Sequence, residues 1–253
     1  MVDVKECIGG IVMEFKYNRI LLKLSGEAMA EKRDGEIVNP FDTAFLKRIA
    51  AVVSQLVEGG VQVGIVTGGG NVFRGASAKE FTRARADDMG MLVTMLNSLA
   101  VENQLNVAGV KAVTLSAVEM NKVAQLFTKE RAEEYFSKGY VVIFGGGTGN
   151  PYFSTDTAAV LRACEINADA VFLAKNIDAV YSADPKKDPN AVRYTEISCH
   201  QMVDDMLGAI DLTASMIAMN AKMPMELFSL KDLDNIIKAA RGQTAGTTIT
   251  VSD

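Results

Sequence analysis

The chain of 253 residues contains no tryptophan, one histidine and three cysteines, and these shortages exclude several kinds of site. The cysteines lie far apart and form no CxxC pair, so a zinc site is not expected and a reduced, cytoplasmic setting is favoured. They are Cys7, Cys164 and Cys199. The histidine, His200, has no paired nucleophile nearby, which argues against a catalytic role for it. Ser198 and Gln201 form a capping box around it, which predicts an exposed first turn of a helix.

Long apolar runs and excess positive charge are also missing. No run approaches the ~20 apolar residues that a membrane-spanning helix needs, so no membrane association is expected. The net charge is -5, and the chain therefore has no overall basic field for nucleic acid. An acidic protein that binds anions must do so with local groups. The first residues lack the pattern of a secretory signal, and residues 1–16 are expected to form a loose, disordered arm.

Apolar residues, in contrast, make up 49% of the chain, which is ample for a large core. Strand-like apolar runs recur along it, with helical stretches between them. Six runs are predicted to be buried strands: 19–24, 61–66, 110–115, 140–144, 170–174 and 225–228. Near-continuous apolar strands that alternate with helices are typical of a mostly parallel sheet covered on both faces. The expected fold class is therefore α/β.

Helical spacing of apolar residues appears in three places. One helix is predicted over 45–57 and a second over 91–99. A late helix is predicted with Ser229 as its N-cap and Gly242 beyond its end. Residues 246–251 could close an edge of the sheet, and 176–195 are expected to form a loop or hairpin outside the main alternation.

In parallel sheets ligands bind beyond the carboxyl ends of the strands, so the loops that directly follow strands are informative. The first strand ends in KLSGE (23–27), where Lys23 falls inside an otherwise apolar run. Burying an ammonium group without a partner is expensive. Lys23 is therefore either a strand-end lysine that reaches water or a cation fixed beside a phosphate, and the residue alone does not decide between the two.

The second informative loop is TGGGNVFRGAS (67–77). Its glycines allow backbone N–H groups to converge on an anion, whereas a tight turn would account for only one of them. Gly70 to Ser77 match the P-loop pattern GxxxxGK[ST] except that Ala76 occupies the lysine position, which argues against a Walker-type NTPase. Arg74 could supply the missing charge as a bidentate phosphate clamp.

The third loop, GGGTGNPYFSTD (145–156), directly follows the fourth predicted strand. Its glycines permit close backbone approach, and Asn150-Pro151 predicts a turn. Asp156 starts a predicted helix, where an aspartate is often only a cap. GxGxxG is absent here, so a dinucleotide fold is not indicated. Two glycine-rich anion loops and one lysine strand suggest that two phosphate-bearing ligands meet, as in phosphoryl transfer.

Five motifs occur in an order and spacing that resemble those of the bacterial UMP kinases, a branch of the amino-acid kinase family. They are KLSGE, GGGNVFRG, DDMGM (87–91), GTGNPYFSTD and IDAVYSADP (177–185). The resemblance extends from about residue 17 to the C-terminus. It implies the amino-acid kinase fold, a three-layer αβα sandwich with a mostly parallel central sheet. It further implies one domain (17–253), whose N-terminal part mainly binds UMP and forms oligomer contacts and whose C-terminal part mainly binds ATP.

The resemblance also implies the reaction and its regulation. The expected reaction converts UMP to UDP in pyrimidine nucleotide biosynthesis, by direct in-line transfer from ATP with Mg²⁺ bound to the nucleotide. No direct metal ligand is assigned. A homohexamer, activation by GTP and inhibition by UTP are further expectations, with GTP activation placed near residues 31–36. The Met-rich stretch 89–99 is either a dimer interface or ordinary core packing.

Residue roles are carried over by position from the same resemblance. The catalytic residues would be Lys23, Arg74 and Asp156, with Asp156 orienting Lys23, and Asp87 would hold the UMP ribose hydroxyls. The residues implied for ATP are Lys23, Leu24, Ser25, Gly26, Gly70, Arg74, Lys175, Asn176, Tyr181 and Asp184. The residues implied for UMP are Gly69, Asp87, Thr148, Gly149, Asn150, Pro151, Tyr152, Phe153, Ser154 and Thr155.

Two other functions compete with this interpretation. Another amino-acid kinase would act on carbamate, acetylglutamate or a similar small carboxylate. Such an acceptor has no ribose, so its pocket would not require Asp87. A regulator would sense UMP or UTP without turnover, for which Lys23, Arg74 and Asp156 would not all be needed. The phosphate of UMP, with a second pKa near ~6, is already a nucleophile, so the absence of a catalytic histidine is compatible with a kinase.

Overall fold

A computed structural model of the chain describes residues 14–73 and 80–251. Arg74, Ala76 and most of the predicted N-terminal arm lie outside these residues. Phe15, near the end of that arm, packs against the core, and Lys16 N donates to Ala240 O at 2.8 Å.

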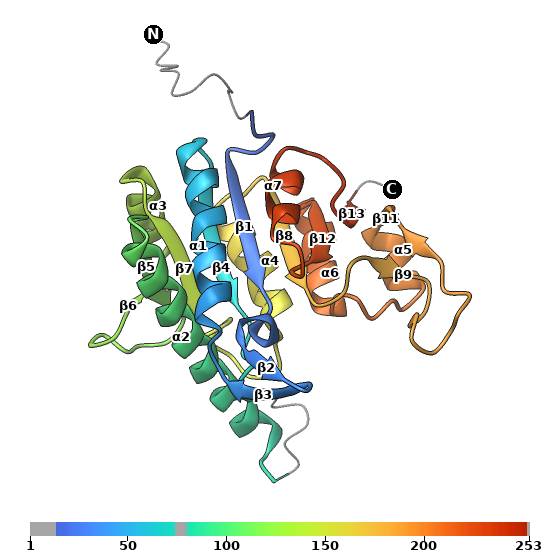
Figure 1. The fold of residues 1–253 in the computed structure, drawn as a ribbon, viewed down its shortest axis with the longest axis horizontal. Coiled ribbons are helices and arrows are strands. Elements are labelled where there is room, and N and C mark those ends of the chain that lie inside the picture. The colour runs from blue at the N-terminus through green and yellow to red at the C-terminus, as the bar shows by residue number, and fades with distance from the viewer. Residues whose placement is uncertain (1–13, 74–79, 252–253) are drawn as a thin grey trace.

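The centre of the fold is a nine-stranded sheet (Figure 1). In spatial order its strands are β11 (Glu196–Ser198), β13 (Thr247–Thr250), β12 (Met225–Ser229), β8 (Ala170–Lys175), β1 (Arg19–Leu24), β4 (Gln62–Thr67), β7 (Val141–Gly145), β5 (Ala112–Ser116) and β6 (Gln125–Leu126). Every neighbouring pair is parallel except β12 and β13. Each of the six predicted strands is present, with its ends shifted by at most two residues.

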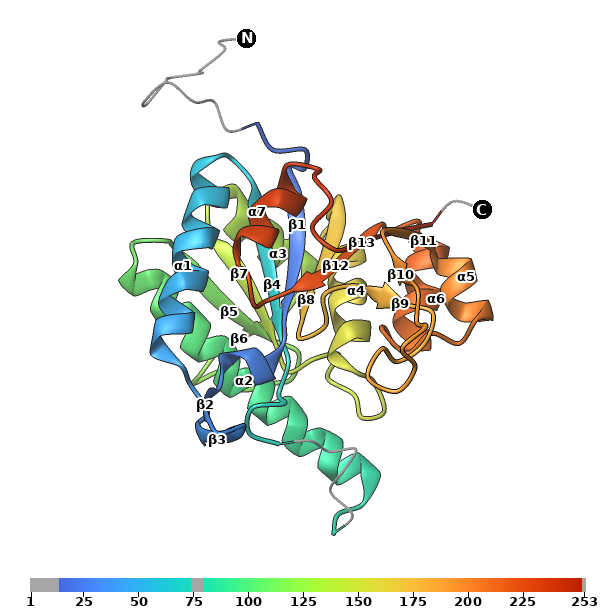
Figure 2. The ribbon, with the colours of Figure 1, turned by 45° about the vertical axis from the view of Figure 1, so that its right-hand side comes forward.

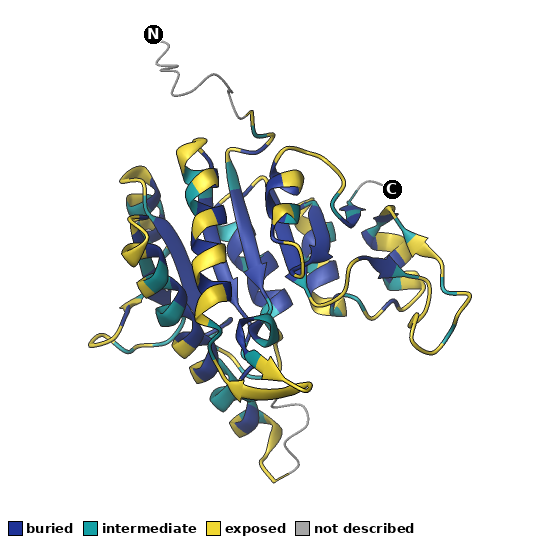
Figure 3. Cartoon of the chain, in the orientation of Figure 1, coloured by how far each residue is buried: buried dark blue, intermediate teal, exposed yellow. Residues whose placement is uncertain are grey.

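Helices cover both faces of the sheet, so the predicted three-layer αβα sandwich is confirmed (Figure 2). One face packs against α1 (Thr43–Glu58), α2 (Arg83–Val107) and α7 (Asp234–Ala240). The other packs against α3 (Lys129–Ser137), α4 (Thr155–Glu165), α5 (Cys199–Asp204) and α6 (Leu212–Ala221). The strands between the two layers are almost wholly buried (Figure 3). None of the helices in 14–73 and 80–251 is long and apolar enough to cross a bilayer.

The alternation of side chains along β1 decides where Lys23 points. Ile20, Leu22 and Leu24 belong to the apolar cluster on the α1 side, whereas Leu21 belongs to the cluster on the α4 side. Because successive side chains of a strand point to opposite faces, Lys23 faces α4.

The same alternation holds in β8, which pairs in parallel with β1. Phe172 lies in the cluster on the α1 side and Leu173 in the cluster on the α4 side, so Lys175 also faces α4. The two lysines therefore come to the same end and the same face of the sheet.

Small elements lie outside the sandwich. A short 3₁₀ turn, η1 (Gly26–Met29), follows β1 and leads into a hairpin of β2 (Glu31–Arg33) and β3 (Glu36–Asn39). The predicted hairpin within 176–195 is present, as β9 (Val180–Tyr181) paired with β10 (Arg193–Tyr194). In Figure 1, the N-terminal half of α2 projects beyond the carboxyl ends of the strands, next to the β2–β3 hairpin.

Two predictions about the C-terminal part were wrong. Ser229 is the last residue of β12, in register with Lys175, and α7 starts only at Asp234. The Ser229 hydroxyl accepts from Lys231 N at 3.2 Å and so stabilises a turn instead of a helix. Residues 246–251 do contain a strand of the sheet, β13, but it does not close an edge, because β11 pairs on its outer side. The capping box at Ser198 is confirmed on the serine side, since its hydroxyl accepts from the backbone N–H of Gln201.

Candidate active site

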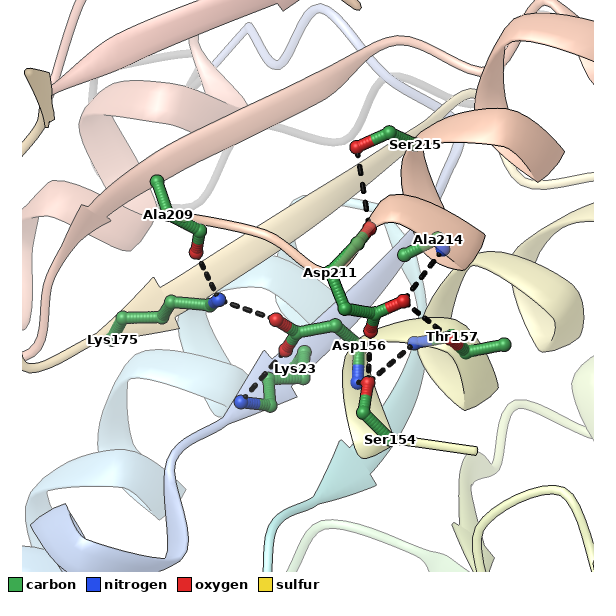
Figure 4. Close-up of polar contacts among 9 residues, drawn as sticks. All are labelled: Lys23, Ser154, Asp156, Thr157, Lys175, Ala209, Asp211, Ala214 and Ser215. Atoms are coloured by element: carbon green, nitrogen blue, oxygen red, sulfur yellow. Dashed lines mark hydrogen bonds and ion pairs between the residues drawn. The ribbon is translucent and has the colours of Figure 1, made fainter. Parts of the chain in front are cut away.

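The carboxyl ends of β1 and β8 bring two lysines onto one carboxylate, that of Asp156 (Figure 4). Lys23 Nζ lies 3.0 Å from Asp156 Oδ1. Lys175 Nζ donates to Asp156 Oδ2 and, at 2.6 Å, to the carbonyl oxygen of Ala209. Lys23 and Asp156 are only 7% and 8% exposed. Two ammonium groups thus share one carboxylate, and the positive charge left over in this buried cluster favours the binding of an anion.

Asp156 is free for this contact because another residue caps its helix. Ser154 is the N-cap of α4, and its hydroxyl accepts from the backbone N–H groups of Asp156 (3.0 Å) and Thr157 (3.2 Å). The interpretation of Asp156 as a mere cap is therefore wrong. Its carboxylate instead points away from the helix N-terminus toward the two lysines (Figure 4).

The lysines determine the protonation of Asp156. Burial raises the pKa of its carboxyl, but the charges and hydrogen bonds of Lys23 and Lys175 outweigh burial and lower this pKa to about 2. Burial lowers the pKa of the Lys175 ammonium, an effect that the Asp156 charge opposes. Asp156 is thus a carboxylate at neutral pH and too weak a base to take a proton from a substrate. Its contacts suit it to orient cations and not to act as a general base.

A second carboxylate, Asp211, ties two helix N-termini together. It is the N-cap of α6, where its side chain accepts from Ala214 N at 2.9 Å. It also accepts from the hydroxyls of Ser154 and Thr157 in the first turn of α4. Asp211 therefore fixes the turn that carries Asp156 (Figure 4). Nothing in the sequence predicted this contact, because it depends on how α4 and α6 pack.

The first two predicted loops pack directly against each other. Gly68 N donates to Leu24 O at 2.8 Å. A Cβ atom on Gly26 would lie 2.5 Å from Gly68 O and 2.8 Å from Gly70 N, which are backbone atoms that cannot move aside easily. Only glycine fits at position 26. Close approach of loop to loop thus explains at least this glycine without any ligand.

The third loop contacts α2 through Asp87. The Oδ2 atom of Asp87 accepts from Tyr152 N and from Arg83 Nε, both at 2.8 Å. Tyr152 has a φ of 72°, a left-handed conformation that is rare for a tyrosine, and the Arg83 guanidinium lies 5.7 Å from its ring centroid. Asp87 and the loop Thr148–Thr155, which were predicted to bind the same ligand, are therefore neighbours.

The sequence and the fold of this chain both have counterparts among known proteins. Residues 18–229 match the sequence model of the Amino acid kinase family. The chain belongs to the amino acid kinase family. The UMP kinase of Bacillus anthracis is 33% identical with a TM-score of 0.87, covering 94% of this chain and 97% of that chain.

Two further solved structures are similar to this amino acid kinase. The UMP kinase of Ureaplasma parvum is 32% identical with a TM-score of 0.85, over 93% of this chain and 99% of that chain. The uridylate kinase of Archaeoglobus fulgidus is 29% identical with a TM-score of 0.70, over 91% and 99% of the two chains. The resemblance to UMP kinases that the motifs indicated is thereby confirmed.

The remaining predicted residues of this amino acid kinase lie at the carboxyl end of β8 and in the β9–β10 hairpin. Asn176 Nδ2 donates to Glu27 Oε2 at 3.0 Å, which joins the end of β8 to η1. Tyr181 bonds through its hydroxyl to Asp178, and Asp184 accepts from Lys186 N. The resemblance implies either Lys175 or Asn176 as a contact of adenosine, and in the structure Lys175 Nζ donates to Asp156.

Proposed function

We propose that this amino acid kinase is a nucleoside monophosphate kinase that transfers the γ-phosphoryl group of ATP to UMP and so forms UDP for pyrimidine nucleotide biosynthesis. The observation that carries the proposal is the group of Lys23, Asp156 and Lys175 at the end of the sheet, where two loops with several glycines converge. The similarity to three proteins described as UMP or uridylate kinases supports the choice of acceptor.

The charges of the cluster suit an in-line displacement between two anions. The UMP phosphate has a second pKa near ~6 and arrives largely as a dianion, so it attacks without a general base. This fits Asp156, whose pKa of about 2 excludes it as a base. Lys23 and Lys175 would offset the charge on the transferred group, and Asp156 would hold both ammonium groups in place.

The order of the strands suggests where each substrate lies. The residues implied for ATP lie at or directly after the carboxyl ends of β1 and β8, in the loop after β4, or in the β9–β10 hairpin: Lys23, Leu24, Ser25, Gly26, Gly70, Lys175, Asn176, Tyr181 and Asp184. Arg74 is assigned to the same junction, although it lies outside the described residues. The residues implied for UMP follow β4 and β7 or lie on α2: Gly69, Asp87 and Thr148 to Thr155. The two phosphates would meet between β1 and β4, with the N-terminal part of the domain binding mainly UMP.

Mg²⁺ enters this reaction as part of the substrate MgATP. Among residues 14–73 and 80–251, no group of three His, Cys, Asp or Glu side chains is arranged to hold a metal ion. Both oxygens of Asp156 already contact lysines. The site therefore fits an ion held chiefly by nucleotide phosphate oxygens, with Asp156 as the adjacent protein carboxylate, and such an ion would neutralise phosphate charge.

Subunit contacts and regulation are part of the same proposal. On α2, Val93 and Met95 are buried in the core, whereas Leu92 and Leu96 are 58% and 46% exposed. The Met-rich stretch thus contributes to the core and also offers an apolar face, which supports its use as a contact in a homohexamer. GTP as an activator near the β2–β3 hairpin and UTP as an inhibitor complete the proposal, as does a cytoplasmic location.

The test is a panel of acceptors. ADP release from MgATP is measured with UMP, dUMP, CMP, carbamate and acetylglutamate offered separately, each with and without GTP. We expect turnover that is selective for UMP. Turnover with carbamate or acetylglutamate would instead assign a carboxylate or carbamate kinase. Tight UMP binding without turnover of any acceptor would assign the sensor.

A further inference from the structure

A reciprocal pair of buried amides connects α2 to the loop after β4. Asn71 Nδ2 donates to Asn97 Oδ1 at 2.9 Å, and Asn97 Nδ2 donates to Asn71 Oδ1 at 2.7 Å. The two residues are 4% and 0% exposed. Burying two amides costs free energy unless their polar atoms are bonded, and here each amide satisfies the oxygen of the other.

The second N–H of each amide reaches a different backbone segment. Asn97 donates to Gly68 O at 2.6 Å, in the loop after β4. Asn71 donates to Pro40 O at 2.9 Å, in the segment before α1. The pair therefore holds the loop 68–73 against α2 at two points, Gly68 and Asn71, and joins the loop to the segment before α1.

The loop after β7 is bonded to the same helix one turn earlier. Thr94 Oγ1 accepts from Gly146 N at 2.9 Å. Thr67 Oγ1, at the end of β4, donates to Thr94 O at 3.0 Å and lies 3.2 Å from Ser98 Oγ. Asp87 also accepts from Tyr152 N. Helix α2 therefore contacts, along one face, both loops that are proposed to bind UMP, the loop 68–73 after β4 and the loop 146–155 after β7.

We propose that Asn97 and Asn71 are positioning residues that set the loop 68–73 on α2 and thereby the geometry of the acceptor site. The inference rests on the proposed function, because it takes Gly69 and the loop 148–155 as parts of that site. The apolar core could fill the same space without amides, but apolar side chains would not fix the register of a backbone carbonyl. A loop displaced by about 1 Å from its productive place is enough to cost a large factor in rate.

Leucine substitutions separate positioning from stability. In Asn97→Leu, the side-chain oxygen of Asn71 and the carbonyl oxygen of Gly68 lose the amide that donates to them, and both stay buried. Both the melting temperature and kcat/KM for UMP should therefore fall. In the double variant Asn71→Leu/Asn97→Leu both amides are gone, and part of the melting temperature should return. Its kcat/KM for UMP should nevertheless stay at least about tenfold below wild type, mainly through a higher KM, because the loop 68–73 still lacks its side-chain hydrogen bonds to α2.

Asn106→Leu is the control, at an exposed asparagine of the same helix. Asn106 lies near the C-terminal end of the same helix and makes two hydrogen bonds to Ala112, at 3.0 and 3.2 Å. Ala112 is the first residue of β5, so this contact lies at the end of the sheet opposite the carboxyl ends of the strands, from which the loops start. Its kcat/KM for UMP should stay within about twofold of wild type. Recovery of kcat/KM together with the melting temperature in the double variant would overturn the proposal. So would an equal loss in the control. If Asn97→Leu does not fold, the double variant and the control decide by themselves.

The wild-type protein in the same assay distinguishes a failure of the proposed function from a failure of the positioning role. If it does not phosphorylate UMP, the proposed function fails, and positioning is then measured by amide hydrogen exchange. The amides of residues 68–73 should exchange faster in the double variant than in Asn106→Leu, while exchange in α2 itself is unchanged. Equal exchange in the two variants would overturn the positioning role.

Discussion

Lys23 Nζ lies 3.0 Å from Asp156 Oδ1, and this contact joins the end of the central strand β1 to the first turn of α4, which covers one face of the sheet. The fold does not require a charged residue at position 23, because an apolar side chain would also fill the end of β1. Compared with apolar side chains of similar volume, a buried ion pair of this kind adds little net stability, although removing one partner alone is destabilising. The presence of this ion pair is better explained by chemistry, and the first predictions therefore concern the charges of the cluster.

Lys23→Ala should abolish turnover while UMP binding is largely kept. The ammonium group would act on the transferred phosphoryl group, so its removal should lower kcat at least about a hundredfold. Steady-state UDP formation and calorimetric UMP binding are measured on the same preparation. Lys138→Ala is the control, since this lysine is 56% exposed on α3 and pairs with Glu134. Unchanged turnover in Lys23→Ala would remove the role assigned to Lys23.

Lys175→Met decides between two roles for this lysine. If Lys175 acts on the reacting group through its place on Asp156, kcat should fall at least about a hundredfold. If it is a contact of adenosine, KM for ATP should rise while kcat is kept. We expect the first result, because Lys175 bonds to Asp156 and to Ala209 O. A rise in the KM for ATP alone would contradict it.

Asp156 should also make stability depend on acid pH. Its pKa falls from 3.8 to about 2 on folding, so the carboxylate contributes stability above pH 3.8 that is lost as the pH falls toward 2. A shift of this size corresponds to about 2 kcal/mol of the free energy of unfolding. Asp156→Asn should therefore unfold at lower denaturant concentration at pH 7, and its deficit should shrink below pH 4. A deficit that is constant with pH would contradict this linkage.

Glu226 has the opposite linkage. Burial in β12 raises the pKa of its carboxyl, although Thr248 Oγ1 donates to it. A raised carboxyl pKa means that the charged form costs stability at neutral pH, and that the cost disappears as the pH falls toward the ordinary carboxyl range. Glu226→Gln should raise the melting temperature at pH 7.5, with a smaller gain at pH 5. Glu36→Gln, at an exposed glutamate in the β2–β3 hairpin, is the control. A gain that grows at lower pH would refute the assignment.

The strands and the two lysines could be predicted from the sequence for a physical reason. The apolar runs of β1 and β8 are long enough to show, and strict alternation then places Lys23 and Lys175 on the face of Leu21 and Leu173. The contact of Lys175 with Asp156 follows only when this alternation is applied to β8 and the position of α4 is known, so the motifs did not predict it.

The parts that escaped prediction depend on packing between distant segments. Helix α6 (LTASMIAMNA) has apolar or small residues nearly all round, so no helical period marks it. The bond from Asp211 to Ser154 requires α4 and α6 to be docked first. Ser229 looks like an N-cap in sequence, yet β8 holds it in register as a strand residue. The Asn71–Asn97 pair joins residues 26 positions apart and leaves no local signal.

The most direct test compares Asp156→Asn with the wild-type protein for UDP formation from MgATP and UMP, with UMP binding measured by calorimetry in parallel. If two lysines on one carboxylate perform the transfer, wild type turns over UMP, and the variant loses at least about a hundredfold in kcat while binding UMP within about threefold of wild type. A variant that retains its kcat, or a wild-type protein that binds UMP without forming UDP, would contradict that mechanism.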